Sequence, residues 1–270
     1  MRLLIAVKSC RQDLERGCHQ AIRDTWGKDA VALGADVVFF TGDWVPACPV
    51  KQDEAILNCK DDYDSLPFKT REICRYAVAR SYDYVFLCDT DTFVIPERLL
   101  KSGFELYDYY GVIRLEVGKT FAYDAVDRQG KHWPLDKCYP WASGGIGYFL
   151  SKRATYIISH IEPDIWAEDL WVGQVMGEQQ ARGQLAIADA RNFNLFVSWH
   201  FPQMLYGESY DPEIGWMQDL YSGLPPCADY CNYPYSGLRT RVFDVATERY
   251  YNLPPMVAKR RIQLGKVRLA

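Results

Sequence analysis

Apolar and polar residues alternate in blocks along the N-terminal part of the chain, with the lengths expected for short buried strands separated by amphipathic helices. Three apolar runs, each bounded by polar or turn-forming residues, predict buried strands: RLLIAV, ADVVFFTGD and YVFLCD. Between the first two runs, apolar residues recur at helical spacing and predict one helix from Arg11 to Trp26, with an apolar face made of Leu14, Cys18, Ile22 and Trp26.

Two prolines mark the starts of further helices. Pro67 is expected to open a helix that runs to Arg80, and Pro96 to open another, because proline is tolerated in the first turn of a helix. Strands that alternate with helices in this way are typical of an α/β fold. We therefore predict a mostly parallel central sheet flanked by helices on both faces.

The second half of the chain continues the same alternation. GVIRLEVG predicts a strand, and WASGGIGYFLS predicts a glycine-rich loop that leads into a strand. Helices are expected from Lys152 to His160 and from Leu170 to Met176. From Ser209 to Pro255 turn-forming residues, proline and tyrosine dominate, and no element is predicted. No repeat or composition break marks a second domain, so we expect a single domain over residues 1–270.

Composition and charge narrow the class of protein. Hydrophobic residues make up 49% and charged residues 24% of the sequence, which is ordinary for a globular protein in water. A net charge of -4 gives no long-range attraction to nucleic acid. The apolar run from Leu3 to Val7 is too short for a signal peptide or a transmembrane segment. We expect a cytoplasmic protein, or a Golgi-lumenal one if a membrane anchor precedes this sequence.

Nine cysteines are scattered along the chain without a C-x-x-C pair, which indicates neither a disulfide framework nor a zinc ribbon. Cys227 and Cys231 share the loop LPPCADYCNYP, where a disulfide and two free thiols are both compatible with the sequence.

Two carboxylates, Asp89 and Asp91, stand at the end of the run VFLCDTD. Ligands of open α/β sheets bind beyond the carboxyl ends of the strands, and residues two apart face the same side if the chain stays extended. Such a pair repels itself and loses hydration unless a cation joins it. Hard oxygen ligands suit magnesium or manganese, and a nucleotide diphosphate supplies further oxygens. Capping and solvated roles are the alternatives for an isolated D-x-D.

A second acidic pair, Glu168 and Asp169, lies at the expected start of a helix. One interpretation is capping of the exposed backbone N–H groups of that helix. The flanking Trp166 and Trp171 suggest another, an aromatic-walled pocket in which a carboxylate with a raised pKa acts as a base.

Glycines and a histidine complete the candidate chemistry. Gly144, Gly145 and Gly147 in SGGIG either let the backbone approach a ligand closely or form a tight turn. His200 in VSWHFP is a core or surface histidine, or a ligand of manganese.

Five segments, in the same order, resemble the inverting β-1,3-glycosyltransferase family that contains the fringe N-acetylglucosaminyltransferases and the β-1,3-galactosyltransferases. They are IAVKSCR, AIRDTWG, DYDSLPFKT, SGGIGYFLS and EDLWVG, and the resemblance runs from Ile5 to about His200. One departure concerns the acidic motif, since many family members carry three consecutive acids where this chain has DTD.

The resemblance implies a GT-A fold with a Rossmann-like nucleotide-sugar-binding half at 1–110, an acceptor and catalytic half at 111–205, and a C-terminal extension at 206–270. It implies a UDP-sugar donor and a divalent metal, Mn²⁺ or Mg²⁺. The residues that match the donor-binding segments are Ser9, Arg11, Lys69, Asp89, Gly144 and Gly145.

The resemblance also implies which residues bind the metal and which one is the base. Asp91 would bind the metal, Asp89 would face the ribose or contact the metal indirectly, and His200 is the candidate C-terminal metal ligand. Asp169 would be the catalytic base. Displacing UDP in one step needs a cation at the leaving diphosphate and a base on the opposite face, and these residues can fill both roles.

The implied activity is transfer of a sugar from the UDP-sugar to a hydroxyl of a saccharide or a glycoprotein glycan, with formation of a β-linkage. Galactose, N-acetylglucosamine, glucuronic acid and xylose all remain open as the donor sugar. A non-catalytic carbohydrate-binding protein is an alternative, because 19 Tyr and 8 Trp offer faces for sugar stacking. A haloacid-dehalogenase-type phosphatase also places D-x-D after an apolar strand, but Phe93 stands where that pattern requires Thr or Val.

Overall fold

The computed structural model describes residues 1–44, 50–190, 198–200, 217, 221, 240–244, 249–253 and 267–269. The chain forms two compact units, Met1–Ser198 and Trp199–Ala270. In the second unit, the described strands form a three-stranded antiparallel sheet in the order β15-β14-β16, made of β14 (Thr240–Asp244), β15 (Arg249–Leu253) and β16 (Val267–Leu269). The expected single domain and its inner boundaries stay a prediction.

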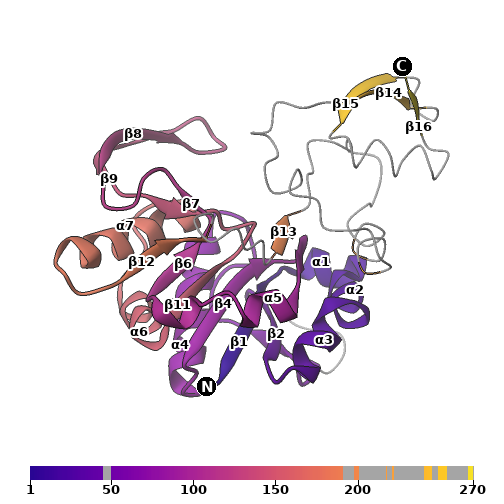
Figure 1. The fold of residues 1–270 in the computed structure, drawn as a ribbon, viewed down its shortest axis with the longest axis horizontal. Helices are drawn as coiled ribbons and strands as arrows, with labels where there is room; N and C mark the ends of the chain where they lie inside the picture. Colours follow the sequence, from indigo (N-terminus) through magenta and orange to yellow (C-terminus); the bar gives the residue numbers. More distant parts are fainter. Residues whose placement is uncertain are drawn as a thin grey trace. The chain divides into compact units, whose positions relative to one another are not determined.

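A seven-stranded sheet in the order β12-β6-β11-β4-β1-β2-β3 forms the centre of the first unit (Figure 1). Its strands are β1 (Leu3–Lys8), β2 (Asp36–Thr41), β3 (Glu54–Ile56), β4 (Tyr84–Asp89), β6 (Tyr109–Gly111), β11 (Tyr148–Ser151) and β12 (Ile187–Asp189). Only β11 among them runs antiparallel to its neighbours, β4 and β6. The expected α/β fold with a mostly parallel central sheet is confirmed.

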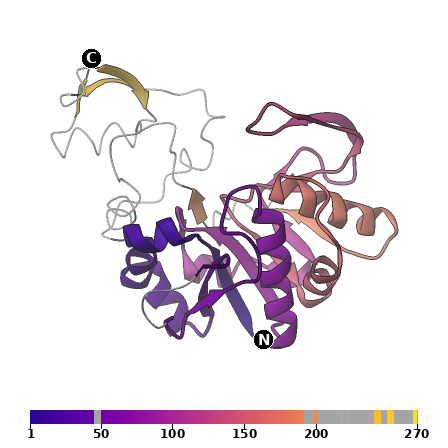
Figure 2. The ribbon, with the colours of Figure 1, turned by 180° about the vertical axis from the view of Figure 1, so that it is seen from behind.

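Helices flank this sheet, and α4, α6 and α7 contact one another. Figure 2 shows α4 lying across the face of the sheet that is turned away in Figure 1. These three helices span Leu66–Ala79 (α4), Lys152–His160 (α6) and Glu168–Ala181 (α7). Pro67 lies in the first turn of α4, and Pro96 opens the short α5 (Pro96–Leu100), as expected. The helix predicted from Lys152 to His160 is confirmed, and α7 extends the predicted one at both ends.

The single helix expected between Arg11 and Trp26 is wrong. The structure has three short helices instead, α1 (Arg11–Arg16), α2 (Cys18–Asp24) and α3 (Trp26–Ala32). Gly17 adopts a left-handed conformation with φ of 88°, and Thr25 departs from helical geometry with ψ of -121°. Burial of Cys18, Ile22 and Trp26 follows the predicted apolar face, so the periodicity identified the buried side but not the breaks.

The strand expected in GVIRLEVG is only partly present: Gly111 is the last residue of β6, and Ile113–Arg114 form β7, which pairs with β10 (Trp141–Ala142) outside the central sheet. A hairpin of β8 (Phe121–Val126) and β9 (His132–Cys138) was not predicted, because most of its side chains are exposed and the apolar alternation is weak. The remaining elements are β5 (Thr92–Val94), the 3-10 helix η1 (Phe104–Leu106) and β13 (Ser198–His200).

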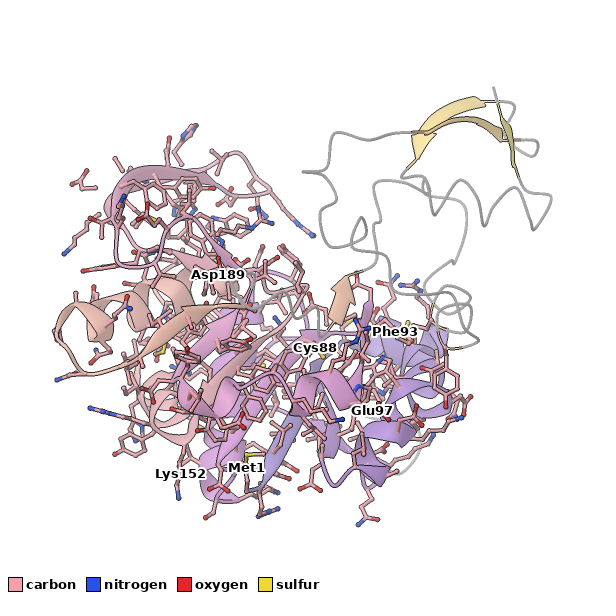
Figure 3. The ribbon with its side chains drawn as sticks, viewed as in Figure 1. Met1, Cys88, Phe93, Glu97, Lys152 and Asp189 are labelled. Atoms are coloured by element: carbon pink, nitrogen blue, oxygen red, sulfur yellow. The ribbon has the colours of Figure 1, made fainter. Side chains whose placement is uncertain are left out.

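The reversed direction of β11 brings different parts of the chain to the same edge of the sheet. Figure 3 shows Cys88, near the end of β4, and Asp189, at the end of β12, toward the upper edge. Met1, before β1, and Lys152, directly after β11, lie toward the lower edge. The glycine-rich loop that precedes β11 therefore meets the carboxyl ends of the parallel strands.

Candidate active site at the ends of strands β1 and β4

The carboxyl ends of β1 and β4 form a topological switch point. From β1 the chain builds β2 and β3 on one side, and β4 then pairs with the other side of β1. Open α/β sheets bind their ligands in the crevice at such a point. Lys8 and Asp89 are the last register pair between β1 and β4, so both lie at this crevice.

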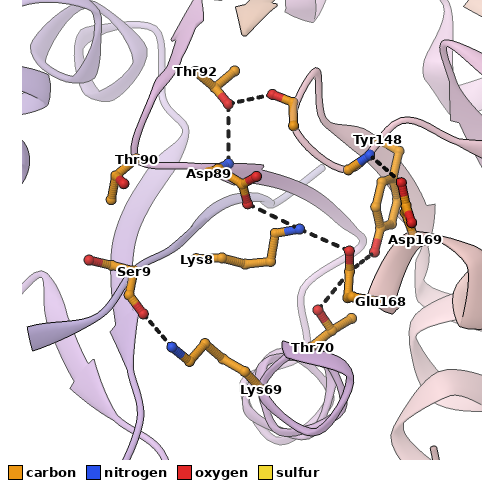
Figure 4. Close-up of polar contacts among 12 residues, drawn as sticks. Lys8, Ser9, Lys69, Thr70, Asp89, Thr90, Thr92, Tyr148, Glu168 and Asp169 are labelled. Atoms are coloured by element: carbon orange, nitrogen blue, oxygen red, sulfur yellow. Dashed lines mark hydrogen bonds and ion pairs between the residues drawn. The ribbon is translucent and has the colours of Figure 1, made fainter. Parts of the chain in front are cut away.

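Lys8 is the buried cation at the centre of the site (Figure 4). Its Nζ lies 3.2 Å from Oδ1 of Asp89 and 3.0 Å from Oε2 of Glu168. Burial by itself lowers the pKa of a lysine, but the charges of the two carboxylates and their hydrogen bonds outweigh it and raise the pKa of Lys8 above its ordinary value. Lys8 is therefore charged, and its charge is matched by two acids from distant parts of the chain.

Glu168 is fully engaged by donors. Its Oε1 accepts a hydrogen bond from Oγ1 of Thr70 at 2.7 Å and another from the hydroxyl of Tyr148, while Oε2 faces Lys8 (Figure 4). Burial, together with the charge of Glu168, raises the pKa of Tyr148 well above its ordinary value, so the tyrosine stays a donor. Glu168 thus serves as a fixed, buried anion.

Asp169 is half-buried beside this anion and differs from it in its contacts. Its Oδ2 accepts from the backbone N of Gly144 at 3.3 Å, and its Oδ1 from the backbone N of Leu170 at 2.8 Å. Burial, and then the charge of Glu168, raise the pKa of Asp169 to about 6. Ala167, which precedes α7 as its N-cap residue, has no capping side chain, and Asp169 itself accepts from an N–H group of the first turn, as the capping interpretation expected. A carboxyl group whose pKa lies near neutrality is suited to accept a proton.

The two tryptophans do not form the expected aromatic wall as a pair. Trp171 is fully buried in the apolar core, whereas Trp166 is half-buried and its ring lies 6.5 Å from that of Tyr63. The raised pKa of Asp169 has another cause, namely burial and the neighbouring carboxylate.

The tight-turn interpretation of the glycine-rich loop applies at Gly147, while close approach of its backbone to a ligand stays a prediction. Gly147 has φ of 93° and forms the tight turn into β11. A Cβ on Gly144 would lie 3.1 Å from Oε2 of Glu168 and 3.5 Å from Nζ of Lys8, so this position packs directly on the charged residues. The loop is tied to β5, because Oγ1 of Thr92 donates to the carbonyl oxygen of Gly145 at 2.7 Å.

The DTD segment places its acids in different surroundings. Asp91 is buried, while the side chain of Asp89 is 32% exposed and its Oδ1 faces Lys8. Thr90, between them, donates to Oδ2 of Asp13 at 3.0 Å. No group of three or more His, Cys, Asp or Glu side chains suited to a metal occurs among the described residues. The two carboxylates are hard ligands that fit magnesium or manganese if a diphosphate completes the shell.

The predicted donor-binding residues Ser9, Arg11 and Lys69 meet around Asp61. Nζ of Lys69 donates to the carbonyl oxygen of Ser9 and lies 3.0 Å from Oδ1 of Asp61. The backbone N of Arg11 donates to Oδ2 of Asp61 at 2.6 Å, while its exposed side chain pairs with Glu15. Burial alone would raise the pKa of Asp61, but these hydrogen bonds and Lys69 lower it. Asp61 also lines an open pocket of about 530 Å³, together with Asp43, Asn58, Cys59, Lys60 and Asp62.

Several residues of this site were not selected from the sequence: Lys8, His19, Asp61, Thr70 and Tyr148. A signal existed for Lys8, since a charge at the end of an apolar run had already drawn attention to Asp89. Asp61 directly precedes the quoted segment DYDSLPFKT. Other predictions concern residues whose side chains the structure does not describe. His200 ends strand β13, but its side chain, like Cys227 and Cys231, lies outside the described residues.

No protein-family model matches the chain. Over 181 residues the sequence is 30% identical to a hydroxyproline O-galactosyltransferase of Arabidopsis thaliana, and the match covers 58% of this chain and 25% of that protein. The chain thus spans about a quarter of the length of this curated relative.

Similar solved structures include a glycosyltransferase involved in the glycosylation of the major capsid of PBCV-1, with a TM-score of 0.41 and 13% identity over 80% of this chain and 99% of that one. Another is 2-C-methyl-D-erythritol 4-phosphate cytidylyltransferase of Thermus thermophilus, with a TM-score of 0.37 and 14% identity, covering 83% and 98%. The apo-form glycosyltransferase GlyE of Streptococcus pneumoniae has a TM-score of 0.36 and 12% identity, covering 87% and 63%. These likenesses are distant.

In the part of the chain that the structure describes, no helix has the length and apolar character that crossing a bilayer requires.

Proposed function

We propose that this protein is a glycosyltransferase of the GT-A type that moves a sugar from a UDP-sugar to a hydroxyl group of a saccharide or glycan, with inversion to a β-linkage. The similarity to a plant galactosyltransferase supports a glycosyltransferase-like function. The observation that carries the proposal is the position of Asp169. It is a half-buried carboxyl group with a pKa of about 6, next to the charged residues at the switch point of the sheet.

The donor side of the proposed reaction would be formed by the ends of β1 and β4. Ser9, Arg11 and Lys69 would hold the nucleotide, and Asp89 and Asp91 would hold a manganese or magnesium ion. When bound, the metal would neutralise charge on the leaving diphosphate.

The acceptor side would be formed by the start of α7. Asp169 would take the proton of the acceptor hydroxyl at Oδ1 or Oδ2 while that oxygen attacks the sugar from the face opposite the diphosphate. The backbone N of Gly144 and the first turn of α7 orient the carboxyl group. Glu168 is unsuited to this role, because Lys8, Thr70 and Tyr148 occupy its oxygens.

A screen of UDP-sugars for manganese-dependent UDP release tests the proposal. We would offer UDP-galactose, UDP-N-acetylglucosamine, UDP-glucuronic acid and UDP-xylose, with simple sugars, a glycan and a hydroxyproline-containing peptide as acceptors. We expect acceptor-dependent UDP release with one donor and a β-linked product. Sugar binding without UDP release from any donor would instead favour a carbohydrate-binding protein.

A further inference from the structure

Lys8 joins the two sides of the proposed site without facing the solvent. Its side chain is only 2% exposed and is enclosed by the protein. Its ammonium group nevertheless contacts Asp89, at the end of β4, and Glu168, at the start of α7. These elements belong to the donor side and the acceptor side, respectively.

The other two hydrogen-bond partners of Glu168 do not connect it to Asp89. Thr70 lies on α4 and Tyr148 on β11, and neither residue has a described hydrogen bond to Asp89. Lys8 and Glu168 are 160 residues apart in sequence and 3.0 Å apart in space. Lys8 is therefore the described side chain that bonds to both the DTD segment and the acidic pair at α7.

We propose that Lys8 is a positioning residue for sugar transfer, whose ammonium group fixes the separation between Asp89 and Glu168 and thereby the placement of Asp169 relative to the donor diphosphate. This inference rests on the proposed function. An ammonium group carries three donors on a flexible stem, and here the fixed anions on two sides restrict it to one position.

Loss of this link should lower the rate of transfer. Without Lys8, the start of α7 and the end of β4 can shift relative to each other. A misplacement of about 1 Å at a reacting group lowers rates by about 10²-fold. The alternative is that Lys8 only neutralises buried Glu168 and stabilises the fold, with no effect on the geometry of the reacting groups.

Two variants separate these roles. Lys8→Met alone leaves Glu168 charged and unpaired, and the protein then risks unfolding. The double variant Lys8→Met/Glu168→Gln removes both charges, and the introduced glutamine can still accept from Thr70 and Tyr148 through its amide oxygen. Its reference is the natural protein, because in Glu168→Gln alone the amide NH2 group would face the Lys8 ammonium group and the link would already be lost.

We expect the double variant to stay folded, as judged by circular dichroism, and to transfer sugar about 10²-fold more slowly than the natural protein at saturating donor and acceptor. Transfer at the natural rate by the folded double variant would overturn the proposal. Arg75→Met serves as a control for the loss of a cation, because Arg75 pairs with Glu72 on the surface of α4, and it should leave transfer unchanged.

Crystal structures of the double variant and of the natural protein without ligand give a readout that does not need activity. The proposal expects the Asp89 carboxylate to leave, in the double variant, the position that it has in the natural protein. An unmoved Asp89 overturns it. If no UDP-sugar is turned over by the natural protein, the proposed function fails, whereas the crystallographic comparison still decides whether Lys8 positions Asp89.

Discussion

The hydroxyl oxygen of Ser9 lies 2.7 Å from Nε2 of His19, a buried ring that stacks on Phe39 with the ring centres 4.3 Å apart. Nδ1 of the same ring lies 3.4 Å from Oε1 of Glu54, which is paired with Arg23. Burial lowers the pKa of His19 in spite of Glu54, so the ring is neutral at pH 7. A neutral ring beside a carboxylate carries its proton on Nδ1, and Nε2 then accepts from Ser9.

The first prediction concerns this contact. His19→Ala removes the nearer acceptor of the Ser9 hydroxyl, leaves the carbonyl oxygen of Cys10 at 3.3 Å as the other one, and opens a gap beside Phe39. A lost hydrogen bond costs about 0.5 to 1.5 kcal/mol, and the gap adds to this loss. We expect urea unfolding at a lower midpoint and weaker UDP binding, because Ser9 lies at the end of β1 beside Lys69. His160→Ala, at an exposed histidine of α6, is the control and should change neither the urea midpoint nor UDP binding. Unchanged unfolding of His19→Ala would show that this contact contributes nothing.

The second prediction concerns the base. Asp169→Asn keeps the size of the side chain and an oxygen for the N–H of Leu170, but it cannot take up a proton. General-base catalysis contributes about 10²- to 10⁴-fold, so we expect the transfer rate to fall by at least that range. UDP affinity, measured by calorimetry, should survive because Asp169 faces the acceptor. If transfer continues at the natural rate, another group is the base.

The third prediction is a pH dependence. The pKa of Asp169 is raised from 3.8 to about 6, so between these values the folded state binds more protons than the unfolded state. The contribution of this group to the free energy of unfolding therefore falls as the pH rises through this window. Asp169→Asn should gain stability relative to the natural protein as the pH rises from about 4 to about 6, as measured by urea unfolding. A constant difference would contradict the raised pKa.

The same ionisation should appear in the kinetics. Because the base must be deprotonated, kcat/KM should rise with pH, reach half of its maximum at about 6, the pKa of Asp169, and level off at higher pH. The residual kcat/KM of Asp169→Asn should not show this rise with pH.

The fourth prediction concerns the metal. Asp91→Ala should abolish manganese-dependent UDP binding in calorimetry, whereas Asp89→Ala should weaken it less, because Asp89 is already paired with Lys8. Both variants should retain the fold, as judged by circular dichroism. Equal manganese-dependent UDP affinity in Asp91→Ala and the natural protein would remove Asp91 from the metal site.

Local patterns in the sequence predicted much of the fold. The apolar runs identified β1, β2 and β4, and the prolines located the starts of α4 and α5. The break at Gly17 was missed, because the apolar periodicity continues across it while the backbone does not. The hairpin of β8 and β9 was missed because its stability does not depend on a strongly apolar face.

The roles of the site residues stay predictions, but the sequence did single out acids that lie close together. Asp89 and Asp91 follow an apolar run, Glu168 and Asp169 begin a helix, and the structure places Asp89 and Glu168 around one lysine. The choice between Glu168 and Asp169 depends on which one Thr70 and Tyr148 contact. Such contacts join residues far apart in the chain and depend on the order of strands in the sheet, which no local pattern specifies.

The position of β11 between β4 and β6 has a consequence for how the molecule can be assembled. A fragment ending at residue 110 would leave one side of β4 without a partner and β6 without a place in the sheet, and exposed strand edges promote aggregation. During synthesis, the buried contacts of Lys8 cannot be completed until α7 has emerged, because Glu168 is one of the two acids paired with it. The first half of the chain is thus expected to depend on chaperones, or on slow folding, until the reversed strand arrives.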